Sequence, residues 1–147
     1  MRICRDRRTK PRGLLVPGPY IEIQGIDALI RKLDSMEDVY TVLRPPMQRA
    51  VYRLQRDMAD YPPQRPGTSY VRTGTLGRRW TTKIAQSPGG LTGTVGNNTS
   101  YGPFVQSSQF QAWMHRGRWQ TDAQVAERNE RDIVGDFNAV IQAKLDE

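Results

Sequence analysis

The sequence contains one cysteine, Cys4, and one histidine, His115. A single cysteine excludes an intrachain disulfide, and these two residues do not form the spaced ligand cluster that a metal site requires. No apolar run approaches the roughly 18 residues of a membrane span. The basic N-terminus also lacks the apolar stretch that follows it in a secretory signal. We therefore expect no metal, no membrane segment and a soluble protein synthesised in the cytoplasm.

Catalytic constellations are also missing. Ser107, Ser108 and Asp122 are near His115 in the sequence, but no nucleophile elbow surrounds either serine. The glycine-containing stretch at 65–79 lacks the Gly-Lys-Ser/Thr sequence of a phosphate-binding loop. The acidic residues lie on predicted helices with polar spacing, which does not indicate the paired carboxylates of a glycosidase. The sequence predicts no catalytic residue, and we expect a protein that is not an enzyme.

Acidic residues are absent from a long central stretch. Residues 61–121 contain seven lysines and arginines and no aspartate or glutamate, whereas residues 122–147 contain three basic and seven acidic residues. Residues 1–12 carry six basic side chains and one acid. This asymmetry is typical of a surface that faces a polyanion or an acidic neighbour. An equally weighted interpretation is that the basic and acidic stretches face each other, within one subunit or between subunits.

The N-terminal third predicts an arm, a strand and a helix. Residues 1–19 combine charge with proline and glycine, which predicts an extended arm without regular structure. Apolar and polar residues alternate at 20–24, as in a short strand. Apolar residues at helical spacing predict a helix at 26–35, and 36–43 keeps the same phase.

Paired prolines follow this helix. Proline has no amide hydrogen and its ring clashes with the preceding helical turn, so Pro45 and Pro46 should interrupt any helix. Because proline suits a first turn, a second helix is expected from there to about Asp60. Its buried face is predicted to hold Met47, Ala50, Val51, Leu54 and Met58. Its solvated side is predicted to hold Arg49, Arg53 and Arg56.

The second half predicts a long loop, a hairpin and a helix. Three prolines and two glycines make 61–75 a loop, and a loop of this length is uncommon unless it has a function. Strands are expected at 78–86 and 91–96, joined as a hairpin by Ser-Pro-Gly-Gly. Thr121 is a good N-cap for a final helix that extends to about Lys144.

This order of elements predicts an α+β fold in which a small antiparallel sheet packs against two or three helices. Residues 20–147 are expected to form a single domain after the basic arm at 1–19. Arm residues predicted to contact a partner or DNA are Arg2, Arg5, Arg7, Arg8, Lys10 and Arg12. Loop residues predicted to contact another subunit are Arg65, Tyr70 and Arg72. A basic strand face is predicted from Arg78, Arg79, Lys83, Arg116 and Arg118.

Aromatic residues interleave with these basic residues. The aromatic set comprises Tyr70, Trp80, Tyr101, Phe104, Phe110, Trp113 and Trp119. A mixture of aromatic and basic side chains could stack bases and hold phosphates. The favoured interpretation is that alternate aromatic side chains pack on the helices while the basic side chains face water. For the arginines, contact with DNA or an acidic partner and simple solvation have equal weight.

Several short motifs resemble one protein family by their order and spacing. The segment IEIQGIDALIRKLDSM places a strand and a glycine before an amphipathic helix. A proline, a Thr-Gly-x-Leu motif and a basic–aromatic strand follow at Pro66, Thr73, Gly74, Leu76, Arg78 and Trp80. A Val-Gly-turn-Tyr-x-x-Phe-Val pattern comes next, at Val95, Gly96, Tyr101, Phe104 and Val105. Over residues 20–145 the chain resembles the neck or tail-completion (head–tail joining, minor tail) proteins of long-tailed, siphophage-type bacteriophages.

The resemblance implies a structural subunit of the virion that needs no cofactor and catalyses nothing. Its copies would form a ring, with a hexamer favoured over a dodecamer, that joins the portal or connector to the tail and surrounds the DNA channel. Expected partners are the connector or stopper and the tail-terminator or tail-tube proteins. The chain departs from the family at Gln106, Ser107 and Ser108, where an acid and Gly-Thr are frequent, and in its additional arm.

Two alternatives stay open at this point. A free basic nucleic-acid-binding protein would account for the sequence pI near 10.0 and the arginines of the arm. A small basic nuclease is the third hypothesis, although no catalytic constellation supports it.

Overall fold

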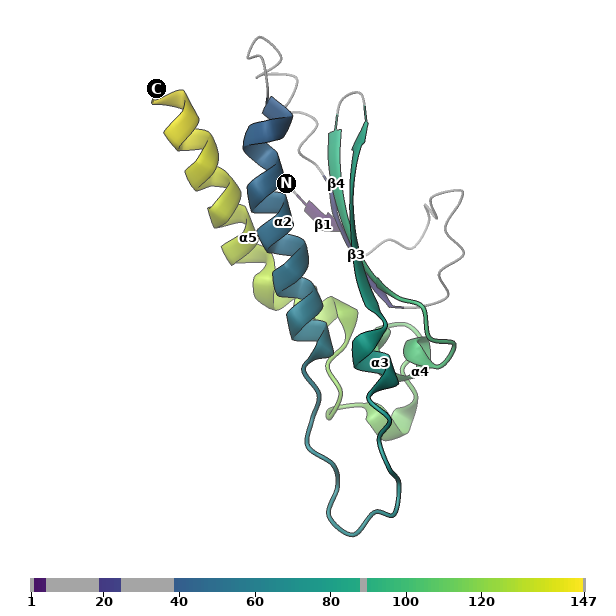
Figure 1. Cartoon of the computed structure of the whole chain (residues 1–147). Coiled ribbons are helices and arrows are strands. Elements are labelled where there is room, and N and C mark those ends of the chain that lie inside the picture. The colour runs from purple at the N-terminus through teal and green to yellow at the C-terminus, as the bar shows by residue number, and fades with distance from the viewer. Residues whose placement is uncertain (1, 5–18, 25–38, 88–89, 147) are drawn as a thin grey trace.

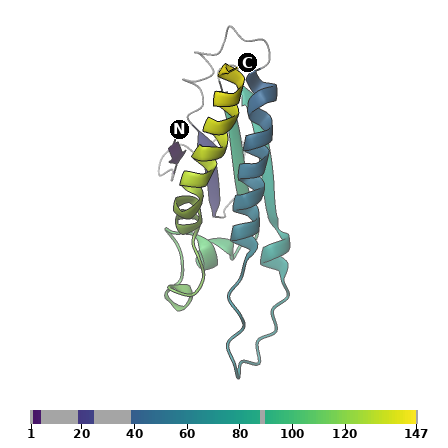
Figure 2. The same ribbon diagram turned by 90° about the vertical axis from the view of Figure 1, so that its left-hand side faces the viewer.

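The computed structural model describes residues 2–4, 19–24, 39–87 and 90–146. In chain order its elements are β1 (Arg2–Cys4), β2 (Tyr20–Gln24), α2 (Val39–Ala59), α3 (Thr75–Arg78), β3 (Trp80–Ser87), β4 (Gly90–Asn97), α4 (Gly102–Gln106), the 3-10 helix η1 (Trp113–His115) and α5 (Asp122–Leu145). The strands form one antiparallel sheet, and α2 and α5 lie side by side over one of its faces (Figures 1 and 2). The predicted α+β fold, a small antiparallel sheet packed against helices, is confirmed.

The sheet has the strand order β1-β2-β4-β3. Its alternation directs Ile21 and Ile23 of β2 into the core, and Ile21 lies opposite Val95 of the central strand β4. Gly93 of β4 faces α2, because a Cβ at this position would lie 2.5 Å from the Met47 sulfur. A residue without a side chain therefore allows the helix to approach the sheet closely.

The strand predicted at 20–24 and the predicted hairpin are confirmed. Strand β3 pairs with β4 along its whole length, from Trp80 opposite Asn97 to Ser87 opposite Gly90. It begins two residues later than predicted, because Arg78 ends the short helix α3 and Arg79 caps it. The helix predicted at 26–35 lies outside the described residues.

Helix α2 contradicts the predicted interruption at the paired prolines. It runs from Val39 to Ala59 with Pro45 and Pro46 inside it. Each proline removes one backbone hydrogen bond, at a cost of about 3 kcal/mol in a helix interior. Burial of Val39, Leu43 and Pro46 on the same face as the rest of the core offsets this cost. Tertiary packing therefore outweighs the local preference.

The predicted buried face of α2 is confirmed, since all five of its apolar residues, Met47, Ala50, Val51, Leu54 and Met58, are buried. Arg49 and Arg56 are exposed as expected. The prediction for Arg53 is wrong. Its guanidinium lies 3.6 Å from a carboxylate oxygen of Asp132 and 3.4 Å from one of Asp136, so it joins α2 to α5. Helical periodicity could not reveal a neighbouring helix that supplies these acids.

Helix α5 begins as predicted. The Thr121 hydroxyl accepts a hydrogen bond from the Gln124 amide at 3.3 Å, and the Gln124 side chain accepts one from the Thr121 amide at 3.0 Å. This reciprocal capping box satisfies two amides that a helix start leaves without partners. Val125, Ile133 and Phe137 then pack into the shared core.

The predicted absence of regular structure across 1–19 is wrong for Arg2–Cys4, which form β1 and pair antiparallel with β2. A sheet edge offers backbone donors and acceptors to any strand without proline, whatever its side chains. The first proline of the chain is Pro11, so residues 2–4 can pair. Residues 5–18 lie outside the described residues.

Candidate functional site: the loop end of the molecule

The long loop leaves the two-layer body and extends beyond one end of it (Figure 1). We call residues 60–74 and 107–121 together the loop end. The loop predicted at 61–75 is confirmed up to Gly74, after which α3 begins. The segment 107–121 contains η1 and several turns before α5. Gly67, Gly74 and Gly117 have φ angles of 75°, 70° and 70°, which favour glycine.

Arginine side chains hold the loop in place. Arg72 Nη1 donates to the Pro62 carbonyl, and its Nη2 donates to the Pro63 carbonyl at 3.5 Å. Arg118 Nη2, from the other segment of the loop end, also donates to the Pro63 carbonyl. The Arg72 guanidinium carbon lies 5.2 Å from the ring centroid of Trp119, within cation–π range. The base of the loop is therefore tied to segment 107–121.

An aromatic cluster lies behind these arginines. The ring centroids of Tyr61 and Trp119 are 4.9 Å apart, and His115 meets Trp119 edge-on at 6.0 Å. The Tyr61 hydroxyl is buried and forms no hydrogen bond of ordinary geometry, although the Trp80 side chain is near enough to oppose part of the pKa rise. Burial, with a contribution from nearby Tyr101, raises the pKa of Tyr61 to about 12. The cluster gives the loop a small apolar support of its own.

Polar contacts anchor the loop end to the helices. Gln120 Nε2 donates to the backbone carbonyls of Asp57 and Asp60, the latter at 3.1 Å. The Asp57 carboxylate accepts from Asn129 at 2.9 Å and lies 3.4 Å from Arg128. Burial alone would raise the pKa of Asp57, but hydrogen bonds from Asn129 and Arg56 and the charge of Arg128 together hold it below its ordinary value of 3.8.

The loop end has an unbalanced positive charge. It carries four arginines, Arg65, Arg72, Arg116 and Arg118, and its only acid is Asp60 at the base of the loop. Within the described residues, no basic residue of the stretch 61–121 forms an ion pair. Desolvation and the charges of Arg65 and Arg72 lower the pKa of Arg118. Desolvation and the charges of Arg65 and Arg118 likewise lower the pKa of His115.

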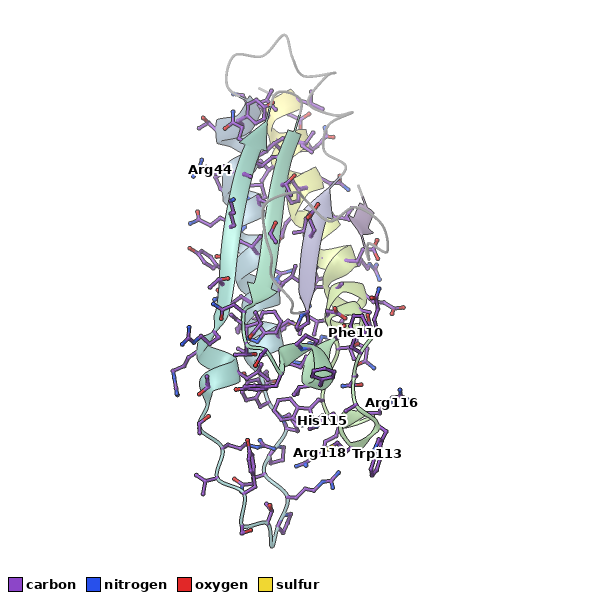
Figure 3. All side chains as sticks on the ribbon, turned by 90° about the vertical axis from the view of Figure 1, so that its right-hand side faces the viewer. Arg44, Phe110, Trp113, His115, Arg116 and Arg118 are labelled. Atoms are coloured by element: carbon purple, nitrogen blue, oxygen red, sulfur yellow. The ribbon has the colours of Figure 1, made fainter. Side chains whose placement is uncertain are left out.

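Large apolar side chains are exposed at the same end. Phe110 is 62% exposed, Trp113 78% and Tyr70 68%, and Met114 and Val71 are also exposed. Figure 3 shows Phe110, Trp113 and Arg116 at the end that also holds His115 and Arg118, with Arg44 toward the other end. Clustered exposed apolar residues mark contact surfaces.

This arrangement contradicts the favoured interpretation of the aromatic residues. Of the seven, only Trp80 is buried, and Trp119 is partly buried. Trp80 begins a strand that α2 covers, whereas Phe110 lies in a turn and Trp113 begins the short 3-10 helix η1, both outside the sheet. Apolar character alone could not indicate that no helix covers these turns.

The predicted basic strand face is wrong as a single surface. Lys83 is exposed on β3, but Arg78 and Arg79 belong to α3 and its cap, and Arg116 and Arg118 belong to the loop end. The predicted loop residues Arg65, Tyr70 and Arg72 lie in the same loop end as Arg116 and Arg118, and Arg72 and Arg118 share the Pro63 carbonyl. Arg2 lies in β1, and the other arm residues, Arg5, Arg7, Arg8, Lys10 and Arg12, lie outside the described residues.

The sequence interpretation considered His115 only as a catalytic residue, which it rejected, and it gave no surface role to Phe110, Trp113 and Trp119. Their shared signal was present, because all four lie in the acid-free stretch between the hairpin and the capped start of α5. A short segment with several aromatics and no strong periodicity is a candidate surface rather than a core element.

No protein-family model, curated protein or solved structure matches the chain. Within the described residues, no group of three or more histidine, cysteine or acidic side chains is placed to hold a metal ion. No helix among those residues is long and apolar enough to span a membrane.

Proposed function

We propose that the chain is a structural subunit of the neck of a long-tailed bacteriophage. Its copies form a ring that joins the portal or connector to the tail and surrounds the path of the DNA. The observation that carries the proposal is the loop end, where Phe110 and Trp113 are exposed in the same segment as Arg116 and Arg118. A partner would cover this apolar surface. The order of sequence motifs that resembles the neck and tail-completion family supports the same function.

The composition of the loop end suits a protein–protein contact. Aromatic and arginine side chains are the residue types that dominate binding energy at interfaces. Trp113 is 78% exposed although it is among the most apolar and bulky side chains of the chain. A neighbour that covers Trp113, Phe110 and Met114 removes this apolar surface from water and gains about 25 cal/mol per Å² buried.

The loop end is also ordered before any partner arrives. Arg72 and Arg118 tie the base of the loop through Pro62 and Pro63, and Trp119 packs against Tyr61. Binding then costs less conformational entropy than it would for a free arm. A rigid body with a pre-ordered extension is suited to reach an adjacent subunit or an adjacent ring.

The proposed assembly implies where in the virion the subunit lies and which proteins it contacts. The subunit would occupy the neck or tail of the virion after synthesis in the host cytoplasm. A hexamer is the favoured ring order and a dodecamer the alternative. The connector or stopper on one side and the tail-terminator or tail-tube proteins on the other would contact the ring. The role is structural and includes no reaction and no cofactor.

Mass determination of the purified full-length chain, alone and with its neck partners, tests the proposal. We expect a ring-sized species and incorporation into particles. The double variant Phe110→Ala/Trp113→Ala should remain folded and lose assembly. Tyr52→Ala is the matched control, because Tyr52 is also an exposed aromatic residue but lies on α2. A wild-type chain that stays monomeric and joins no particle would overturn the proposal.

A second function, a free nucleic-acid-binding protein, is favoured by one observation. The seven basic residues of 61–121 form no ion pair within the described part of the chain. This function predicts a monomer with DNA affinity that falls steeply with salt. Monomeric mass together with DNA binding and absence from particles would select it over the ring.

A further inference from the structure

Two arginines of the loop end converge on one oxygen atom. Arg72 Nη2 and Arg118 Nη2 both donate to the carbonyl of Pro63. The two residues are distant in the sequence, so the fold itself brings the guanidinium groups together. A guanidinium has five N–H donors, and the described hydrogen bonds occupy two in Arg72 and one in Arg118. The remaining donors are available to a ligand.

A third arginine adds to this pair. Arg65 lies two residues after Pro63, whose carbonyl Arg72 and Arg118 share, and its charge lowers the pKa of both Arg118 and His115. Like charges held together are unfavourable unless an anion neutralises them. None of Arg65, Arg72 and Arg118 forms an ion pair with any described acid. The described part of the fold therefore supplies no anion to neutralise the three arginines, and an external anion would do so.

Three acids near the helix pair of a second copy are poor candidates for this anion. Asp132 and Asp136 of α5 already lie against Arg53, and Asp57 already lies against Arg128 and Asn129. Each would have to give up an intramolecular partner to serve a neighbouring loop end. A phosphodiester matches the planar, two-pronged geometry of a guanidinium without that loss. A nucleic-acid backbone also presents such anions at regular spacing.

We infer that Arg65, Arg72 and Arg118 bind backbone phosphates of duplex DNA, with no sequence preference. Contacts to phosphate hold a protein on DNA but carry no base information. The inference rests on the proposed ring, because the ring brings DNA to the loop ends, and it names the atoms that meet the DNA. The apolar residues Phe110 and Trp113 are left to the protein contact.

DNA affinity of the full-length chain, measured by fluorescence anisotropy with a labelled duplex across a salt series, tests the inference. Arg65 is exposed and forms no described hydrogen bond, so Arg65→Ala should leave the fold intact. We expect it to weaken binding about tenfold near 0.1 M salt and to reduce the salt slope by about one. Arg49→Ala is the matched control, because Arg49 is exposed on α2, away from the cluster.

His115 supplies a second measurement, because it is the only histidine and gives one titration curve by NMR. DNA bound at the cluster should raise the pKa of His115, since phosphate charge counteracts that of Arg65 and Arg118. Arg118→Lys keeps the charge but loses the planar fork, and should weaken binding less than Arg118→Ala. Inorganic phosphate is the comparison ligand. If it alone raises the pKa of His115 fully at millimolar concentration, the site takes free phosphate and not a DNA backbone.

Other outcomes overturn the inference. It is wrong if no duplex binds at low salt, or if Arg65→Ala and Arg49→Ala weaken binding equally. It is also wrong if polyglutamate of equal charge competes as well as unlabelled duplex, because the surface would then recognise an acidic protein. A ring that binds no DNA removes the inference and leaves the proposed function. A chain that stays monomeric but binds DNA through Arg65 removes the proposed ring and leaves the DNA contact.

Discussion

The body of this molecule, formed by the sheet with α2 and α5, and the loop end are stabilised by different kinds of contact. In the body, apolar side chains from α2, α5 and the sheet are buried together, and Arg53 meets Asp132 and Asp136. In the loop end, arginines donate to backbone carbonyls and large apolar residues face water. The body therefore satisfies most of its charged and apolar groups by contacts within the chain. The loop end is ordered by its own contacts, yet it leaves charge and apolar surface unsatisfied.

Two phenylalanines give the strongest test of this contrast. Phe137 is 2% exposed in the core, whereas Phe110 is 62% exposed in the loop end. Phe137→Ala should lower the free energy of unfolding by about 3–5 kcal/mol, because it leaves a cavity. Phe110→Ala should change it by less than about 0.5 kcal/mol. Urea denaturation of the two variants checks this, and equal losses would refute the division into two regions.

Two glycines sharpen the contrast at a smaller scale. A Cβ at Gly93 would meet Met47 and Val51 at 2.5 and 2.7 Å, so Gly93→Ala should cost about 1–3 kcal/mol through overpacking. A Cβ at Gly67 meets nothing within 4 Å, and Gly67→Ala should cost about 1 kcal/mol from its positive φ alone. Thermal unfolding of both variants compares the costs. A smaller loss at Gly93 than at Gly67 would show that α2 does not press on β4 as described.

The prolines inside α2 offer a stabilising variant. Pro45 is exposed, so Pro45→Ala removes no buried surface and restores a backbone hydrogen bond. The gain should be about 2 kcal/mol, because part of the roughly 3 kcal/mol helix penalty is offset by a less restricted unfolded chain. Chemical denaturation measures it. A neutral result would instead indicate that the helix begins at the prolines.

The smallest effect concerns alkaline pH. The pKa of Tyr61 is raised to about 12 in the folded chain, from an ordinary value of 10. The unfolded chain therefore releases this proton first, and stability should fall as the pH rises from 10 toward 12. Tyr61→Phe should flatten that part of the pH profile at little cost, because the hydroxyl forms no hydrogen bond of ordinary geometry. An identical profile in both proteins would contradict the burial of Tyr61.

The same two regions explain what could be predicted from the sequence. Periodicity predicted the buried face of α2 and the strand at 20–24, and the Thr121 cap predicted the start of α5, because these signals are local. The continuation of α2 through Pro46 depends on packing against distant elements, which no local pattern shows. The acid-free stretch predicted a basic surface. It could not predict that Arg72 and Arg118 share the Pro63 carbonyl, since that meeting joins two distant loops.

The strand order has a consequence for how the chain acquires its shape during synthesis. The hairpin β3–β4 is local and can pair as soon as it leaves the ribosome. Strand β2, made much earlier, pairs with β1 on one side, and its other partner is β4, where Ile23 lies opposite Gly93. The pair β1–β2 must therefore wait for β4 while most of the chain is translated, and such long-range pairings form slowly. We expect docking of residues 2–4 and 20–24 onto a preformed hairpin to be the late, rate-limiting event of folding.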